Sequence, residues 1–176
     1  VTISTTGNAV DFGDLTQVKQ LMGACSNGTR GLFGGGYNNL TNAYLDVIEY
    51  ITIDTTGNGT DFGDLTQARS HLSAVADSTR GVFAGGFTGS ATSNVIDYVT
   101  IATTGNATDF GDLIVSGTGA SSCSSNTRGV FAGNGIVNSI EYITIQTTGN
   151  GTDFGDLTQA RTLSAGASSG TRGVFG

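Results

Sequence analysis

The 176-residue chain contains no proline and no tryptophan, and only 12% of its residues are charged. Disordered chains usually combine high charge with proline, so this composition argues against disorder. Glycine is abundant instead, with 29 residues, and threonine, serine and asparagine fill much of the remainder. These residues are poor helix formers, and they alternate with β-branched and aromatic clusters. The composition therefore predicts an all-β domain that is long enough to bury a core.

Basic residues are also scarce, with 7 Lys and Arg against 14 Asp and Glu and a net charge of −7. Nucleic acids and anionic membrane surfaces are bound by clustered cations, so neither is expected as a partner. No apolar run approaches the roughly 20 residues of a membrane helix, so no membrane insertion is expected. The chain opens with Val1-Thr2-Ile3, without an initiator methionine or a signal peptide, and we expect a mature piece or a fragment.

One stretch, T-T-G-N-x-x-D-F-G-D-L, occurs four times, and a T-R-G triplet follows each copy. The copies are centred on Phe12, Phe62, Phe110 and Phe154. The triplets begin at Thr29, Thr79, Thr127 and Thr171, in steps of 50, 48 and 44 residues. Such a period indicates a repeat architecture. We expect a single repeat domain over residues 1–176, with units at approximately 1–36, 37–86, 87–133 and 134–176.

Each unit contains four strand-like segments that are separated by turn residues. In the second unit these segments span residues 69–76, 79–86, 94–101 and 109–113. The third segment is apolar on both faces, as in the copy that begins at Val47, which is typical of a strand between two layers. Four strands in 44 to 50 residues predict a β-propeller blade. A stacked β-solenoid, whose rungs are usually shorter, is the alternative.

The order of residues in each unit resembles a kelch blade. A basic position is followed by an apolar strand, by an aromatic strand that ends in Gly-Gly, and by two strands with aromatic residues. The basic position holds Lys19, Arg69 and Arg161, with Gly117 in the third unit. The glycine pair is Gly35-Gly36 and Gly85-Gly86, with Gly133-Asn134 in the third unit. The tyrosines are Tyr50, Tyr98 and Tyr142, and the D-F-G-D phenylalanines stand at the tryptophan position of kelch blades.

The near-identical units are also similar to kelch-like repeat proteins of marine bacteriophages and other large aquatic viruses. The two resemblances imply an all-β β-propeller with four kelch-like four-stranded blades. These blades either close on themselves or form an arc of a larger ring, and we favour the arc. The viral resemblance implies a virion-associated component.

The charged residues of the repeats have structural and functional interpretations. The eight D-F-G-D aspartates fit Asx turns and ion pairs with the T-R-G arginines, while calcium binding is the functional alternative. The T-R-G arginines are Arg30, Arg80, Arg128 and Arg172. They fit a ladder in which each bridges backbone carbonyls or an Asp of the next blade, and an anion site in the channel is the alternative. The D-F-G motif does not indicate a kinase, because no H-R-D loop accompanies it.

The two cysteines and the single histidine offer little for catalysis. Cys25 and Cys123 each lie five residues before a T-R-G arginine, where the other units have Val75 and Ala167. A small apolar core position fits all four residues, so we expect free thiols rather than a disulfide. His71 is expected in a first strand, as a channel or core residue without a serine, cysteine or metal partner. No catalytic residue, metal or cofactor is predicted.

The loop between the second and third strands differs between units, at residues 37–45, 87–93 and 134–138. Variable loops on a rigid scaffold are common binding sites. The candidate binding residues are Tyr37, Asn39, Tyr44 and Phe87. Their aromatic rings can stack on sugar rings or anchor a protein, and ordinary loop packing is the alternative.

The sequence thus predicts a non-enzymatic binding or structural propeller in the virion or outside the cell. We expect a tail fibre or surface component that recognises a host glycan or protein, or contacts other virion proteins. An intracellular kelch-type adaptor is one alternative. A second is part of a propeller enzyme whose catalytic residues lie outside this segment.

Overall fold

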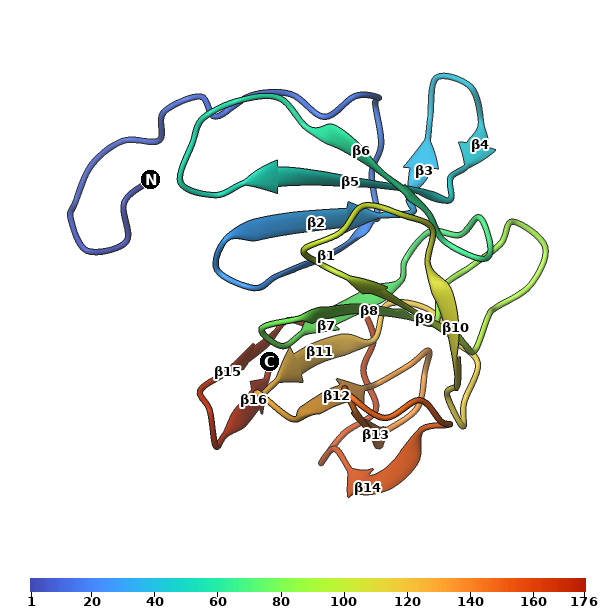
Figure 1. The fold of residues 1–176 in the computed structure, drawn as a ribbon. Helices are drawn as coiled ribbons and strands as arrows, with labels where there is room; N and C mark the ends of the chain where they lie inside the picture. Colours follow the sequence, from blue (N-terminus) through green and yellow to red (C-terminus); the bar gives the residue numbers. More distant parts are fainter.

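The computed structural model describes residues 1–176 and contains strands and turns but no helix (Figure 1). Three four-stranded antiparallel sheets, called blades 1 to 3 below, make up most of the chain. Blade 1 contains β1 (Gly23–Ser26), β2 (Arg30–Gly34), β5 (Val47–Thr52) and β6 (Thr60–Asp64). Blade 2 contains β7 (Ser73–Ala76), β8 (Arg80–Ala84), β9 (Val95–Thr100) and β10 (Thr108–Asp112). Blade 3 contains β11 (Ser121–Ser124), β12 (Arg128–Ala132), β13 (Ser139–Thr144) and β14 (Thr152–Asp156).

Two smaller sheets complete the fold. The half-blade consists of β15 (Gly166–Ser168) and β16 (Gly173–Phe175), which match the first two strands of a blade. A short hairpin, β3 (Tyr37–Asn38) and β4 (Ala43–Tyr44), projects from the loop between β2 and β5. In every blade the strands pair in chain order, so each blade is a simple up-and-down sheet. The all-β blade architecture expected from the sequence is confirmed.

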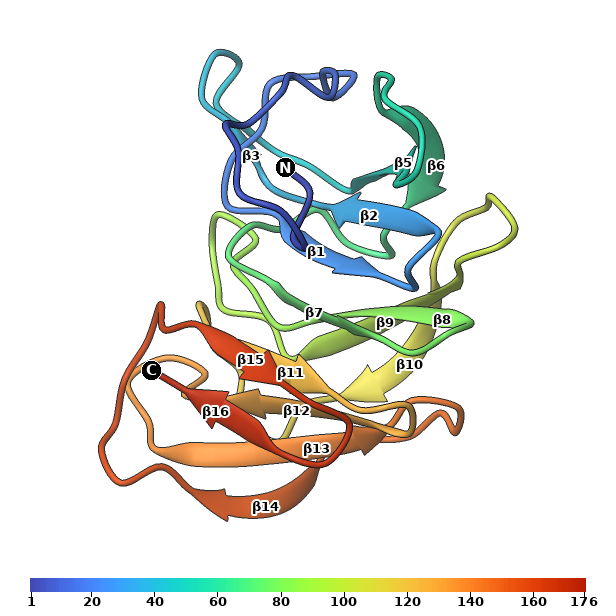
Figure 2. The ribbon, with the colours of Figure 1, turned by 90° about the vertical axis from the view of Figure 1, so that its left-hand side faces the viewer.

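The first strands of the units lie side by side in an open row. β7 lies between β1 and β11, and β11 in turn contacts β15 (Figure 2). Blade 1 and the half-blade stand at opposite ends of this row.

The strands of the second unit follow the prediction closely except at the start. The expected first strand began at Arg69, whereas β7 begins at Ser73. His71 interrupts the strand because its φ of 54° lies in the left-handed region. His71 therefore precedes the strand instead of lying in it, which corrects the expectation. The first D-F-G-D copy, Asp11–Asp14, also lies outside any sheet, since no third strand runs beside it.

The core lies between the blades, as the two-sided apolar pattern of the third strands predicted. One buried cluster joins blades 1 and 2, and a second joins blades 2 and 3. The first contains Leu32, Ile48, Phe62, Leu65, Leu72, Phe83, Val99 and Ile101. The second contains Val75, Val82, Ala84, Ile96, Phe110, Leu113, Phe131, Ile143 and Ile145. The hydrophobic core is therefore formed where the face of one blade packs against the face of the next.

Glycines of the T-R-G triplets let neighbouring blades approach closely. The Cys25 thiol lies against Gly81 of the next blade, and Cys123 lies in the same way against Gly173. A Cβ at Gly173 would stand 2.5 Å from the Cys123 sulfur, so this contact leaves no room for a side chain. Both cysteines are free, and burial raises the pKa of Cys25 to about 12. The expected free thiols are found, but of the four residues at this position only Val75 is fully buried, while both cysteines are half-buried and Ala167 is exposed.

Candidate functional site

The up-and-down topology sorts the connections onto two faces (Figure 1). The repeated-turn face carries the turns between first and second strands and between third and fourth strands. These span residues 27–29, 77–79, 125–127 and 169–172, and residues 53–59, 101–107 and 145–151. The variable-loop face carries all other connections. These span residues 35–46, 85–94 and 133–138, and residues 16–22, 65–72, 113–120 and 157–165.

The repeated-turn face is built from the same hydrogen bonds in every unit. A side-chain oxygen accepts the N–H groups of the T-R-G threonine and arginine, which closes an Asx or Ser turn. The accepting residues are Asn27, Asp77, Ser125 and Ser169. Burial would raise the pKa of Asp77, but hydrogen bonds from Arg80, Gln146 and Thr79 outweigh it and lower that pKa. The hydrogen bonds of these side chains therefore stabilise the turns of the scaffold.

The T-R-G arginines link the blades. The Arg30 guanidinium lies 4.4 Å from the centre of the Tyr50 ring and donates to the Ile101 carbonyl of blade 2 at 2.9 Å. Arg80 lies 4.3 Å from the Tyr98 ring and donates to the Ile145 carbonyl of blade 3 at 3.1 Å. The expected ladder to backbone carbonyls of the next blade is thus confirmed for Arg30 and Arg80, whereas Arg128 and Arg172 make no such bond.

The pairing of these arginines with D-F-G-D aspartates is not found. The two salt bridges of the structure use Lys19 and Arg69 instead, whose partners are third-strand acids. Arg30, Arg80 and Arg128 instead lie over tyrosines of their own blades, and Arg30 and Arg80 also donate to carbonyls of the next blade. Within blade 1, burial raises the pKa of Asp64, and repulsion from Asp46 and Asp61 adds to this shift.

The D-F-G-D and T-G-N segments form a second link between blades. The Asn106 side-chain oxygen of blade 2 accepts the Asp64 N–H of blade 1 at 3.1 Å, and the Gly105 N–H donates to the Phe62 carbonyl at 2.7 Å. The same pattern joins Asn58 to Asp14 and Asn150 to Asp112. The repeated motif is therefore an interface between blades, a role that turn propensity alone did not reveal.

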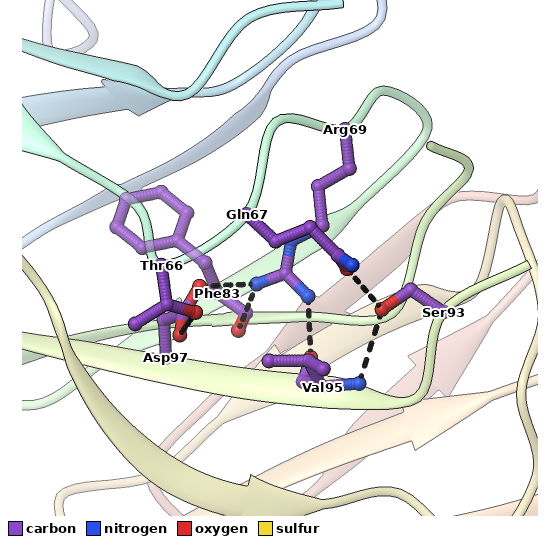
Figure 3. A network of polar contacts seen from close by, with 7 residues as sticks. All are labelled: Thr66, Gln67, Arg69, Phe83, Ser93, Val95 and Asp97. Atoms are coloured by element: carbon purple, nitrogen blue, oxygen red, sulfur yellow. Dashed lines mark hydrogen bonds and ion pairs between the residues drawn. The ribbon is translucent and has the colours of Figure 1, made fainter. Parts of the chain in front are cut away.

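A buried polar network supports the variable-loop face of blade 2 (Figure 3). Arg69 pairs with Asp97 at 2.7 Å, and both side chains are fully buried. The guanidinium also donates to the Val95 carbonyl at 2.6 Å, and the Thr66 hydroxyl donates to Asp97 at 2.5 Å. Burial raises the pKa of Asp97, and Arg69 and Thr66 partly offset this effect. Lys19 and Glu49 form the corresponding pair in blade 1, at 2.6 Å.

Blade 3 keeps the buried acid without the cation. Glu141 accepts the N–H groups of Ile114 and Val115, at 2.6 and 3.0 Å. Gly117 stands at the place of Arg69, and the Asn134 side chain donates to the Val115 carbonyl at 2.5 Å. The buried polar side chains beneath the variable-loop face therefore differ between blades, as the loops themselves do.

Three of the four predicted binding residues come together on the variable-loop face. Tyr37 and Tyr44 face each other across the β3–β4 hairpin, with ring centres 5.0 Å apart. Phe87 of the next loop meets Tyr44 edge to face at 5.7 Å. All three rings are half-buried. Packing within the loops, the alternative role considered for them, therefore covers part of each ring. Asn39 is exposed in the hairpin turn and is not part of this cluster.

The variable-loop face also exposes large hydrophobic side chains that the sequence analysis missed. They are Val18, Leu21, Leu40, Ile114, Ile136 and Leu163. Leu40 is 74% exposed and Ile136 is 88% exposed, whereas Ile53 is the only such residue in the turns of the repeated-turn face. A single exposed aliphatic residue has no sequence signature, so no local pattern pointed to them. Exposed large hydrophobic residues are thus more numerous in the connections of this face than in the turns of the other.

His71 does have a serine neighbour, contrary to the sequence prediction. Its Nδ1 atom lies 2.9 Å from the Ser70 hydroxyl oxygen. Ser70 is only 1% exposed, so a substrate has no access to this hydroxyl. No three His, Cys, Asp or Glu side chains gather closely enough to hold a metal ion. The geometry around His71 thus fits a structural role.

No protein-family model matches the chain, and a search of curated proteins finds no similar sequence. None of its secondary structure is a helix of the length and hydropathy that a membrane crossing requires. The candidate site is therefore interpreted from its own residues, and the variable-loop face is the strongest candidate.

Proposed function

We propose that the chain is a non-enzymatic binding module that contacts its partner with the variable-loop face. One observation carries this proposal: this face collects the loops that differ between units, together with the Tyr37–Tyr44–Phe87 cluster. The opposite face repeats one set of turns. A rigid scaffold with one variable face suits recognition of a specific partner.

The scaffold contacts of the charged residues support a non-enzymatic role. Buried acids pair with Lys19 and Arg69, while Arg30 and Arg80 bind backbone carbonyls. The ion pairs lie within single blades, the arginines link one blade to the next, and the buried Glu141 of blade 3 accepts backbone N–H groups, so these charged groups are engaged in scaffold contacts.

We propose a host glycan or host surface protein as the partner. Aromatic rings beside amide groups suit sugars, and the Tyr37 hydroxyl already lies 3.0 Å from the Asn42 side-chain oxygen. The exposed Leu40 and Ile136 side chains favour a protein partner, because sugars offer little apolar surface. The same side chains support the second candidate, a kelch-type protein-interaction adaptor.

We further propose that the blades are of the kelch type and that the chain is a virion-associated tail fibre or surface component. This part rests on the resemblance of the repeated units to kelch-like proteins of aquatic viruses. Mass spectrometry of purified virus particles tests it directly. Recovery of the chain only from infected-cell extracts, and never from particles, would contradict a virion location.

The binding face is tested with a glycan array and with intact host cells. Leu40→Asp places a charge on the hairpin tip and should abolish binding to a protein receptor, while Tyr37→Phe removes the hydroxyl and should weaken glycan binding. Asn126→Ala, on the repeated-turn face, is the matched control, since Asn126 is exposed and makes no side-chain hydrogen bond. Equal loss with the control variant would reject the variable-loop face as the site.

A further inference from the structure

Four asparagines of the chain are followed directly by glycine, and this pair of residues is chemically labile. The pairs begin at Asn27, Asn58, Asn134 and Asn150. The backbone nitrogen after an asparagine can attack the Cγ atom of the asparagine side chain, and glycine leaves this attack unhindered because it has no Cβ. Three of the pairs stand in the same tripeptide, Asn-Gly-Thr, so the local sequence predicts equal reactivity for them.

Hydrogen bonds hold the glycine nitrogen in three of the four pairs. Each of these N–H groups donates to a carbonyl oxygen of another segment, at 2.7, 2.7 and 3.1 Å: Gly59 to Asp14, Gly151 to Asp112 and Gly135 to Thr118. A nitrogen that is held in this way cannot turn towards the preceding side chain without losing its hydrogen bond. The fold therefore protects Asn58, Asn134 and Asn150.

The Gly28 N–H, by contrast, donates to no group of the protein. Gly28 is exposed in the turn between β1 and β2, and beyond its chain neighbours no heavy atom lies within 4 Å of its Cβ position. Solvent base therefore has access to this nitrogen. Asn27 is the one asparagine of the four whose following nitrogen is free to act as a nucleophile.

The turn around Asn27 also favours the charge that this attack creates. The Asn27 Oδ1 atom accepts the Thr29 N–H at 3.0 Å and the Arg30 N–H at 2.9 Å. Attack at Cγ places negative charge on Oδ1, and a pair of backbone N–H groups at this distance stabilises an oxyanion. The side-chain oxygens of Asn58 and Asn150 accept only one N–H each.

We propose that Asn27 is a site of spontaneous deamidation in the folded chain and that its own turn promotes the reaction. The Gly28 nitrogen loses its proton to solvent base and forms a bond to Cγ of Asn27. The Cγ–Nδ2 bond breaks, and Nδ2 takes up a proton and leaves as ammonia. Water then opens the resulting succinimide to aspartate or isoaspartate. The site lies on the repeated-turn face and goes beyond the binding function proposed for the variable-loop face.

The modification removes a contact between blades 1 and 2. The Asn27 Nδ2 atom donates to the Ser78 carbonyl at 3.1 Å, and a carboxylate has no proton to donate there. Blade 2 carries a carboxylate at the same position, Asp77, but Gln146 of blade 3 donates to it at 2.5 Å. The residue of blade 2 that corresponds to Gln146 is Ala102, whose side chain has no donor. Deamidation therefore leaves an unpaired carboxylate beside the Ser78 carbonyl.

Incubation of the 176-residue chain in mildly alkaline buffer, followed by peptide mapping with mass spectrometry, tests the proposal. Asn27 should deamidate at least about fivefold faster than the other three asparagines, because each of those must first lose a hydrogen bond. The same chain unfolded in urea is the matched control, and its three Asn-Gly-Thr pairs should react at equal rates. Equal rates in the folded chain, or an unmodified Asn27, would overturn the proposal.

A second comparison tests the promoting role of the turn. Asn27 should react no more slowly in the folded chain than in urea, and a slower reaction would reject this role. Gly28→Ser copies the Asp77-Ser78 turn of blade 2, but its Cβ hinders the attacking nitrogen. This variant should slow deamidation of Asn27 severalfold and leave the other three rates unchanged.

The variant Asn27→Asp reproduces one product of the reaction and tests its effect on the blades. It should lower the melting temperature more than Asn126→Asp, which adds the same charge to the corresponding turn of blade 3 at an exposed residue. Equal melting temperatures of the two variants would show that the bond to Ser78 does not hold the blades together and would overturn this part of the proposal.

Discussion

Gly117 and Asn134 occupy one shared space in blade 3. A Cβ at Gly117 would stand 2.5 Å from the Asn134 carbonyl oxygen. In blade 2 the same two positions hold Arg69 and Gly86, and Gly86 has a φ of 115°. The Asn134 side-chain oxygen would stand 2.8 Å from the same Cβ, so the two departures of the third unit from the repeat are coupled: a side chain at position 117 collides with both the backbone and the side chain of Asn134.

This coupling predicts the behaviour of two variants. Gly117→Arg alone should destabilise the chain by about 1–3 kcal/mol, because the new side chain overpacks the space that Asn134 fills. Adding Asn134→Gly should recover much of that loss, since the introduced guanidinium could then reach Glu141 as Arg69 reaches Asp97. Urea unfolding of both variants and of Asn134→Gly alone gives the coupling energy. Strictly additive effects would disprove the coupling.

Replacing Gly63 of the repeated D-F-G-D motif with alanine should destabilise the chain far more than replacing Gly57 of the T-G-N turn. Gly63 has a φ of 144°, and a Cβ there would stand 2.5 Å from the Gly105 carbonyl of blade 2. Gly63→Ala should therefore cost about 1–3 kcal/mol through this clash. Gly57 lies in the T-G-N turn with nothing within 4 Å of its Cβ position, so Gly57→Ala is the matched control. Similar melting temperatures for the two variants would contradict the contact.

The sequence predicted the blades better than it predicted the contacts between them. Strand β9 was foreseen because Ile96 and Tyr98 follow the period of a β-strand within the range of local pattern. The bond from Asp64 to Asn106 spans 42 residues, and no local pattern reveals it. Asn106 stands in the turn between β9 and β10, and that position alone does not indicate a partner in blade 1.

The candidate site was foreseen only in its aromatic part. Tyr37, Tyr44 and Phe87 were identified because they stand in loops that vary between units, and the structure brings them together. Leu40 and Ile136 were missed because a single exposed aliphatic residue has no sequence signature. Only the fold shows that their loops share one face.

Burial of the D-F-G-D phenylalanines differs along the chain and should determine the cost of removing them. Phe110 is 3% exposed and meets the Tyr98 ring edge to face at 5.9 Å, so Phe110→Ala should cost about 3–5 kcal/mol. Phe154 makes the same ring contact with Tyr142 but is 54% exposed, so Phe154→Ala should cost about 1 kcal/mol or less. Chemical denaturation measures both. A loss below about half a kcal/mol for Phe110→Ala would mean that the D-F-G-D strand is exposed.

The Cys25 thiol should be protected from reaction and should make stability depend on alkaline pH. Burial raises its pKa from 9.0 to about 12, so the folded state favours the neutral thiol. Near about pH 8, Cys25 should react with a thiol reagent at least about 100-fold more slowly than a free cysteine, because the thiolate is the nucleophile. The stabilisation from the neutral thiol is complete below the unfolded pKa of 9.0 and is lost as the pH rises towards about 12. Cys25→Val, which copies Val75 of blade 2, should remove this part of the alkaline loss, and unfolding free energies of both chains across the range measure it. An unchanged pH profile in the variant would show that the thiol is accessible to solvent in the folded chain.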